Sequence, residues 1–285
     1  MFPSQFDYHR PSSVAEAIQF LQNDPDAKIL AGGHSLIPAM KLRLAVPSAL
    51  VDLSQVDGLR GIAVNGDIRI GAMTTYAQLR DSDALKAAMP LLSEVANNVG
   101  DPQVQSRGTL GGSLAHADPA ADFTAVVLAL GGSVKAVGTG GEREISADDL
   151  FVDLFTTSLN PDEVITEVTI PNPAARTGMA YQKRGHPASG YAVVGVAVSV
   201  TVGDDGNVSD ARIAVTGCTP KATRATAAEQ ALVGKPLNEA SIDAAAKAAP
   251  EGLDINGDHY ASAEYRAHLV EVDTRRALEA AAKAL

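Results

Sequence analysis

The apolar positions near the N-terminus have the spacing of a helix followed by short strands. Val14, Ile18 and Leu21 recur at helical intervals behind Ser13-Val-Ala-Glu16, the pattern of a capping box. This pattern predicts a helix over about residues 13–22. Short apolar runs flank the glycine-rich segments, so the opening of the chain is expected to have the order β-α-β-α-β. The expected strands are 28–30, 49–53 and 67–72.

A longer helix and a long loop are expected next. An apolar stripe predicts one helix over 83–99, formed by Leu85, Leu92, Val95 and Val99. The following segment, 100–114, is rich in glycine and polar residues, so we expect a loop. Beyond it the pattern predicts a helix over 120–130 and strands at 133–137 and 163–170.

The pattern changes at Pro171-Asn-Pro173, where two prolines end regular strand pairing. We therefore expect a domain over 1–175 and a second domain over 176–285. In the second domain, β-branched runs with glycine-rich turns predict a small antiparallel sheet, and Ala-rich runs predict helices. The expected strands are 179–183, 191–202 and 211–216, and the expected helices are 222–232, 241–249 and 261–285.

Charge and cysteine content narrow the classes of function. The 285 residues include 34 acidic and 23 basic side chains, a formal net charge of −11. This balance argues against sequence-independent nucleic-acid binding and against docking on anionic membranes. No apolar run has the length of a transmembrane segment, and the first ten residues lack a signal pattern. Cys218 is the single cysteine, so the chain can supply neither an internal disulfide nor the four thiolates of a cluster.

Two glycine pairs carry the candidate chemistry. Each is flanked by side chains that donate hydrogen bonds: Gly32-Gly33 by His34 and Ser35, and Gly111-Gly112 by Thr109 and Ser113. Adjacent glycines let backbone amides approach a bulky anion, so two such loops would be able to clasp the two phosphates of a dinucleotide. Neither loop has the Rossmann or Walker pattern. On these residues by themselves, a phosphate-bearing ligand and a pair of plain tight turns both stay open.

The motifs around the glycine pairs are long. They read Ala31-Gly-Gly-His-Ser-Leu-Ile-Pro-Ala-Met-Lys-Leu-Arg43 and Gly100-Asp-Pro-Gln-Val-x-x-Arg-Gly-Thr-Leu-Gly-Gly-Ser-Leu114, with shorter companions Ile70-Gly-Ala-Met-Thr-Thr75, Asp118-Pro-Ala-Ala-Asp122 and Tyr181-Gln-Lys183. Together they resemble the flavin-binding medium subunit of the molybdenum hydroxylases, most closely the carbon monoxide dehydrogenase type. The order of elements agrees over essentially the whole chain. The resemblance implies an α+β fold: a FAD-binding domain of the PCMH or vanillyl-alcohol-oxidase type with two α+β subdomains, then a C-terminal antiparallel sheet with helices.

The same resemblance implies a cofactor and two partners. FAD is expected to bind without a covalent bond. A large subunit would carry the molybdenum cofactor and a small subunit two [2Fe–2S] clusters, in a dimer of heterotrimers. Electrons would pass from the clusters through FAD to an external acceptor. The resemblance implies no catalytic residue and no metal ligand on this chain, and a cytoplasmic location in which peripheral membrane association through the complex stays open.

Position by position, the resemblance also implies FAD-binding residues. Asp122 is expected near the adenosine part, Ile165 in the strand beside the cofactor, Lys183 near the flavin ring (with Gln182 as the alternative) and Tyr191 near the ring face. The residues themselves equally allow a helix-dipole role for Asp122 and a surface position for Lys183. Cys218 is expected to be a small buried residue. The complete set is Ala31, Gly32, Gly33, His34, Ser35, Thr109, Gly111, Gly112, Ser113, Asp122, Ile165, Lys183 and Tyr191.

Two other functions stay open at this point. A free-standing flavin oxidase of the same fold would act directly on a substrate, although such enzymes need a larger substrate domain than residues 176–285 provide. A flavin-binding assembly protein would catalyse nothing. The sequence also leaves open the substrate of the complex (carbon monoxide, an aldehyde or an N-heterocycle) and the acceptor (quinone, oxygen or NAD).

Overall fold

The computed structural model describes residues 2–285, so Met1, the first residue of the expected N-terminal domain, lies outside the described residues. The chain divides into two compact units. The first contains the chain up to His116 together with Ser133–Leu150 and Thr157–Thr169. The second contains Ala117–Gly132, Phe151–Thr156 and Ile170–Leu285. Two segments that precede the expected boundary at residue 175 therefore group with the C-terminal part.

The first unit begins with a small parallel sheet. Its strands have the order β1-β3-β2, with α1 and α2 in the two connections, which confirms the expected β-α-β-α-β order. The elements are β1 (Asp7–His9), α1 (Val14–Asn23), β2 (Lys28–Leu30), α2 (Leu36–Lys41) and β3 (Ala49–Asp52). Ser13 caps α1 as predicted, but the Glu16 carboxylate accepts from the amide of Ser12 rather than from that of Ser13. Buried Ala17, Ile18 and Leu21 pack α1 against β3.

A five-stranded sheet completes the first unit, in the order β4-β5-β10-β6-β7. Isoleucines 68 and 70 of β5 and valines 134 and 168 of β6 and β10 are buried, while charged residues between them stay exposed or partly so. This alternation is typical of a sheet with one face on the core. The strands are β4 (Ile62–Asn65), β5 (Asp67–Gly71), β6 (Ser133–Gly138), β7 (Gly141–Ser146) and β10 (Val164–Ile170).

The predicted single helix over 83–99 is wrong. The structure has α4 (Asp83–Ala88) and α5 (Pro90–Asn98), preceded by α3 (Tyr76–Asp81). Met89, between α4 and α5, has φ −152° and ψ 79°, and Pro90 occupies the first turn of α5. Proline lacks an amide hydrogen and disfavours helical backbone at the residue before it, so the helix stops and restarts here.

The prediction of one long loop over 100–114 is also wrong. This segment contains α6 (Pro102–Arg107) and the start of α7 (Leu110–His116). Asp101 caps α6 by accepting from the Val104 amide at 2.9 Å, and Pro102 takes its first position. Aspartate as N-cap followed by proline is a start signal that the glycine content of the segment obscured.

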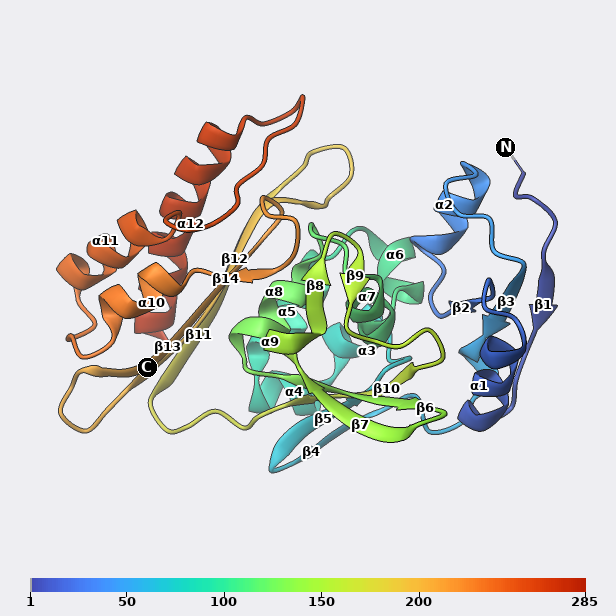
Figure 1. The fold of residues 1–285 in the computed structure, drawn as a ribbon. Coiled ribbons are helices and arrows are strands. Elements are labelled where there is room, and N and C mark those ends of the chain that lie inside the picture. Colours follow the sequence, from blue (N-terminus) through green and yellow to red (C-terminus); the bar gives the residue numbers. More distant parts are fainter. Residues whose placement is uncertain (1) are drawn as a thin grey trace. The chain divides into compact units, whose positions relative to one another are not determined.

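The second unit is built on an antiparallel sheet of order β11-β12-β13-β14, as expected for the C-terminal part. Figure 1 shows α12 lying along this sheet with α10 and α11 beside it. Ala180 of β11 and the valines at even-numbered positions 194–200 of β12 belong to the apolar core shared with these helices. The elements are α8 (Asp122–Ala129), β11 (Thr177–Gly185), β12 (Ala192–Val202), β13 (Val208–Thr216), β14 (Thr223–Arg224), α10 (Thr226–Leu232), α11 (Glu239–Ala248) and α12 (Ala263–Lys283).

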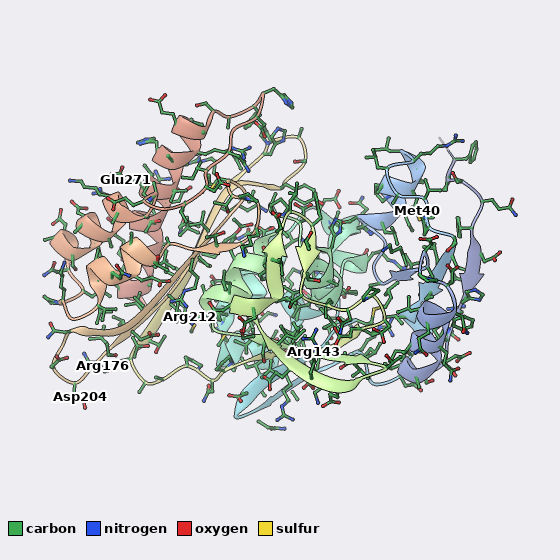
Figure 2. All side chains as sticks on the ribbon, viewed as in Figure 1. Met40, Arg143, Arg176, Asp204, Arg212 and Glu271 are labelled. Carbon is green, nitrogen blue, oxygen red and sulfur yellow. The ribbon has the colours of Figure 1, made fainter. Side chains whose placement is uncertain are left out.

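The remaining elements are short. They are a 3-10 turn, η1 (Leu53–Gln55), then α9 (Ala147–Leu150), β8 (Phe151–Asp153) and β9 (Thr156–Thr157). Within residues 2–285, every helix is too short or too polar to span a lipid bilayer. Side chains labelled in Figure 2 include Arg143 on β7 and Arg212 on β13; Arg212 donates to the Leu128 carbonyl at the end of α8, at 2.9 and 3.2 Å.

Candidate functional site

The first glycine loop connects β2 to α2 and leaves its amides open. Gly33 has φ +78°, a left-handed conformation that favours glycine. The Gly33 carbonyl accepts from the Ile37 amide at 3.0 Å, and this contact starts α2. Within residues 2–285, the amides of Gly32, Gly33, His34 and Ser35 donate to no acceptor. A run of open amides in a turn is an anion-binding arrangement.

The second glycine pair lies at the start of α7, and its amides, unlike those of the first loop, are hydrogen-bonded within the chain. The Gly111 amide donates to the Ala72 carbonyl at 2.9 Å, and the Ser113 amide donates to the Thr109 carbonyl at 3.0 Å. The Gly112 amide donates to Thr109 Oγ1 at 3.2 Å. These three amides therefore already have partners within the chain, and the donors of the second loop differ from the open amides of the first.

The two loops touch each other through their glycines. A Cβ on Gly32 would collide with the Arg107 carbonyl oxygen, and a Cβ on Gly112 would lie 3.2 Å from the Cβ of Ala31. A Cβ on Gly111 would overlap Ala72, in the segment after β5. The absence of side chains at these positions thus lets three backbone segments of the first unit meet. The resulting cradle of open amides fits a diphosphate group.

Asp122 and Lys183 bind each other inside the second unit. Lys183 Nζ donates to Asp122 Oδ2 at 2.9 Å, and the Tyr181 hydroxyl donates to Oδ1 at 2.6 Å. The Asp122 and Lys183 side chains are only 5% and 10% exposed. Burial raises the pKa of the Asp122 carboxyl, and the Lys183 charge and the Tyr181 hydroxyl oppose that effect. Of the two neighbouring residues Gln182 and Lys183, it is therefore Lys183 that faces Asp122.

The segment in front of Asp122 is tied to the sheet by several hydrogen bonds. Thr216 Oγ1 donates to the carbonyls of Pro119 and Ala121, at 2.6 and 3.0 Å. The Gly217 amide donates to the Pro119 carbonyl at 2.7 Å. The start of α8 is thereby held in place, and with it the carboxylate that receives Lys183.

The last two predicted residues differ in exposure. Ile165 is 6% exposed and lies on β10 of the first unit, next to a register shift in the pairing with β6. Tyr191 is 43% exposed and precedes β12 in the second unit. The first unit thus holds both glycine loops and Ile165, and the second holds Asp122, Lys183 and Tyr191.

Sequence reasoning assigned no role to the side chains of Tyr181 and Thr216, although Tyr181 belongs to the Tyr181-Gln-Lys183 motif. Tyr181 stands two residues before Lys183 on one strand, so the two side chains share a face of the sheet. Gly195, in a strand of valines, is a second signal, because a Cβ there would collide with the Tyr181 hydroxyl. Nothing in the sequence around Thr216 marks its hydroxyl as the tie to residues 119–121.

The remaining candidate positions have structural surroundings. Cys218 is fully buried, as expected, and burial raises the pKa of its thiol to about 12, so it is not a nucleophile at neutral pH. Among residues 2–285, no three His, Cys, Asp or Glu side chains gather in a group able to hold a metal ion. His34 Nδ1 lies 3.3 Å from the Gly32 carbonyl within the first loop.

Comparison with protein families accounts for nearly the whole chain. Residues 4–173 match the family described as "FAD binding domain in molybdopterin dehydrogenase". Residues 179–281 match the "CO dehydrogenase flavoprotein C-terminal domain". The first match ends at Pro173, in the Pro-Asn-Pro segment, and the second begins at residue 179.

Individual relatives agree with the family match over their full length. The nicotine 6-hydroxylase medium subunit of Paenarthrobacter nicotinovorans is 41% identical, covering 95% of each chain. The carbon monoxide dehydrogenase medium chain of Hydrogenophaga pseudoflava is 40% identical, covering 99% of this chain and 98% of that one. A solved structure of carbon monoxide dehydrogenase from Hydrogenophaga pseudoflava superposes with a TM-score of 0.94 over 99% of this chain and 98% of that one, at 41% identity. These findings confirm the resemblance drawn from the motifs: the chain belongs to the family of FAD-binding medium subunits of the molybdenum hydroxylases.

Proposed function

We propose that this chain is the FAD-carrying electron-transfer subunit of a molybdenum hydroxylase complex of the carbon monoxide dehydrogenase type. When bound, FAD supplies a centre that accepts electrons singly and passes them on in pairs. The chain's own contribution is to hold the cofactor and to set its electrostatic surroundings. The molybdenum cofactor and two [2Fe–2S] clusters belong, in this proposal, to the large and small partner subunits.

The observation that carries the proposal is the cradle in the first unit. The Gly32 and Ser35 amides, with the two between them, are open, and the glycines bring the second loop directly beside them. A run of unpaired backbone amides in a turn is suited to the two charged phosphates of FAD. The acidic chain needs no basic side chain in this cradle, because backbone dipoles supply the positive potential.

We propose a division of roles among the predicted residues that follows these donors. The open amides of residues 32–35 bind the diphosphate, and Thr109 and Ser113 contribute hydroxyl groups from the second loop. The Gly111 and Gly112 positions keep the two loops close. For Ile165, Asp122, Lys183 and Tyr191, the family resemblance supports contacts to the rest of FAD, and Lys183 is proposed near the flavin ring.

The relatives support a subunit over a free-standing oxidase. Those named above are called medium subunit or medium chain, and the matches cover at least 95% of each chain, so no additional substrate domain separates this chain from them. One is named for nicotine and one for carbon monoxide, at nearly equal identity to this chain. We infer that the substrate is recognised by a partner. We further propose a dimer of heterotrimers in the cytoplasm.

Acid precipitation tests whether the cofactor is non-covalent FAD. The purified chain should carry one FAD, and acid should release all of the yellow colour into the supernatant, where chromatography identifies it. Flavin that stays in the protein pellet, or a flavin that is only FMN, contradicts the proposal.

A further inference from the structure

The buried carboxylate of Asp122 receives hydrogen bonds from two side chains of the same strand. An ionised carboxylate has two oxygens that accept hydrogen bonds, and donors on both oxygens restrict its orientation more than a donor on one. Here Tyr181 takes Oδ1 and Lys183 takes Oδ2, from two positions on the same face of β11. The hydroxyl therefore fixes the orientation in which the other oxygen meets the lysine.

We propose that Tyr181 is a positioning residue: through Asp122, it holds the Lys183 ammonium group in the place where its charge acts on FAD. This inference rests on the function proposed above, in which Lys183 lies near the flavin ring. Tyr181 itself is not assigned a contact with the cofactor.

The surrounding strand makes room for this hydroxyl. Gly195 pairs with Lys183 across β11 and β12, and a Cβ at Gly195 would collide with the Tyr181 hydroxyl and lie 2.8 Å from Cγ2 of Thr216. Glycine inside a strand lowers its stability, and it is typical of sites where another group approaches closely. Thr216 in turn ties down the segment that precedes Asp122. Gly195 in β12 thus leaves room for the Tyr181 hydroxyl, and Thr216 in β13 holds the start of α8, where Asp122 lies.

The electrostatic surroundings of Tyr181 keep its hydroxyl protonated, so that it remains a hydrogen-bond donor. Burial and the neighbouring Asp122 charge raise the pKa of the Tyr181 hydroxyl well above 10, so it keeps its proton at neutral pH. A buried ion pair is stable only when its remaining lone pairs are satisfied, and the tyrosine satisfies one of them. Without the hydroxyl, Oδ1 of the buried carboxylate loses this donor, and the orientation in which Oδ2 meets the lysine is held less firmly.

A double-mutant cycle on the full-length, FAD-loaded protein separates positioning from plain stabilisation. The measurement is the midpoint potential of the bound FAD by spectroelectrochemical titration, with thermal unfolding recorded in parallel. Lys183→Gln removes the charge and should shift the potential to more negative values, changing the ratio of reduced to oxidised FAD at a fixed applied potential by about tenfold. Tyr181→Phe should also shift the midpoint potential to more negative values, changing the ratio of reduced to oxidised FAD by about threefold.

The decisive variant is the double one. If Tyr181 acts through Lys183, Tyr181→Phe adds no further shift in the Lys183→Gln background. If Lys183→Gln does not fold, Lys183→Gln combined with Asp122→Asn removes both charges and serves as the background instead. Tyr8→Phe is the matched control, because it also removes a tyrosine–aspartate hydrogen bond, to Asp52 in the other unit, and should leave the potential unchanged.

Three results overturn the inference. Tyr181→Phe could lower only the melting temperature and leave the potential unchanged, which would make the residue purely structural. The shifts could add fully in the double variant, or Lys183→Gln could leave the potential where it was. A wild-type chain that binds no FAD contradicts the proposed function itself, and this result is distinguishable because it precedes any comparison of variants.

Discussion

At single residues, the tightest requirement within the two glycine loops is steric. Gly32 packs directly against the backbone of residues 107 and 108, so a methyl group there has nowhere to go. Gly33 needs a positive φ, whereas Gly112 lies in a helix and does not. The glycines therefore serve different purposes: Gly32 leaves room for a neighbouring backbone, Gly33 allows a left-handed turn, and Gly112 leaves room for the first loop beside a helix.

Gly32→Ala should weaken FAD binding by about tenfold or more. The added Cβ would collide with the Arg107 carbonyl oxygen and push the two loops apart, and overpacking of this kind costs about 1–3 kcal/mol. The check is a FAD titration of the apoprotein followed by flavin fluorescence. Gly140→Ala is the control, since a Cβ there meets nothing within 4 Å. Equal FAD affinity in the two variants would contradict the role given to the cradle.

The turn of the first glycine loop could be predicted from the sequence. Of the side chains around Asp122, Lys183 could be named from the sequence, whereas the hydrogen bond from Tyr181 could not. The Gly-Gly motif is local, so its turn and open amides follow from neighbouring residues. The Tyr181–Asp122 hydrogen bond joins residues 59 positions apart. A sequence pattern cannot show such a pair, because the contact depends on how β11 pairs with β12 and on where α8 lies.

At the scale of elements, long apolar patterns were predicted correctly and polar or interrupted ones were missed. The buried strand β12 and the helix α12 stand close to their expected ranges. The edge strands β4 and β7 were not predicted, because β4 is only four residues long and β7 carries polar or charged side chains at most of its positions. Edge strands are commonly polar, since this prevents pairing with other chains.

An ion pair at the edge strand β7 gives a prediction about stability and pH. Arg143, labelled in Figure 2, donates to both oxygens of Glu163, at 2.6 and 2.8 Å. These hydrogen bonds hold the pKa of the Glu163 carboxyl below its usual 4.5. The stabilisation is therefore present above the pKa of the unfolded chain, and it is lost as pH falls through the lower pKa of the folded state.

Glu163→Gln should lower the free energy of unfolding at pH 7 by about 1 kcal/mol, a modest value because Arg143 is partly exposed. Urea denaturation at pH 7 and at pH 4 measures the change, and the gap between wild type and variant should narrow at the lower pH. Glu142→Gln, at the more exposed pair with Lys135, should change little. A gap that stays constant or widens toward acid would show that Glu163 does not act as an ionised partner of Arg143.

At the scale of the whole molecule, the residues proposed to contact the cofactor are divided between the two units of the chain. The loops that suit a diphosphate lie in one unit, and the buried Lys183–Asp122 pair lies in the other. The family match runs through both units. Such a chain is suited to carry electrons for a reaction that takes place on another subunit.

The overall architecture could be inferred from motifs because they are long and span the chain. The grouping of Ala117–Gly132 and Phe151–Thr156 with the C-terminal part could not, because it depends on tertiary contacts. The Pro-Asn-Pro segment marks a change in the apolar periodicity along the chain. That periodicity does not show which segments pack together into one compact unit.

The most direct test of the account is the cofactor content of the complex that this chain forms. The chain should be tagged in its native organism, purified under mild conditions with the partners it binds, and analysed for FAD, molybdenum and iron. We predict one FAD per tagged chain, with molybdenum and iron in constant proportion to it and located on two other polypeptides. A tagged chain that purifies alone as a yellow protein, without molybdenum and iron, and that oxidises a substrate by itself would contradict the account.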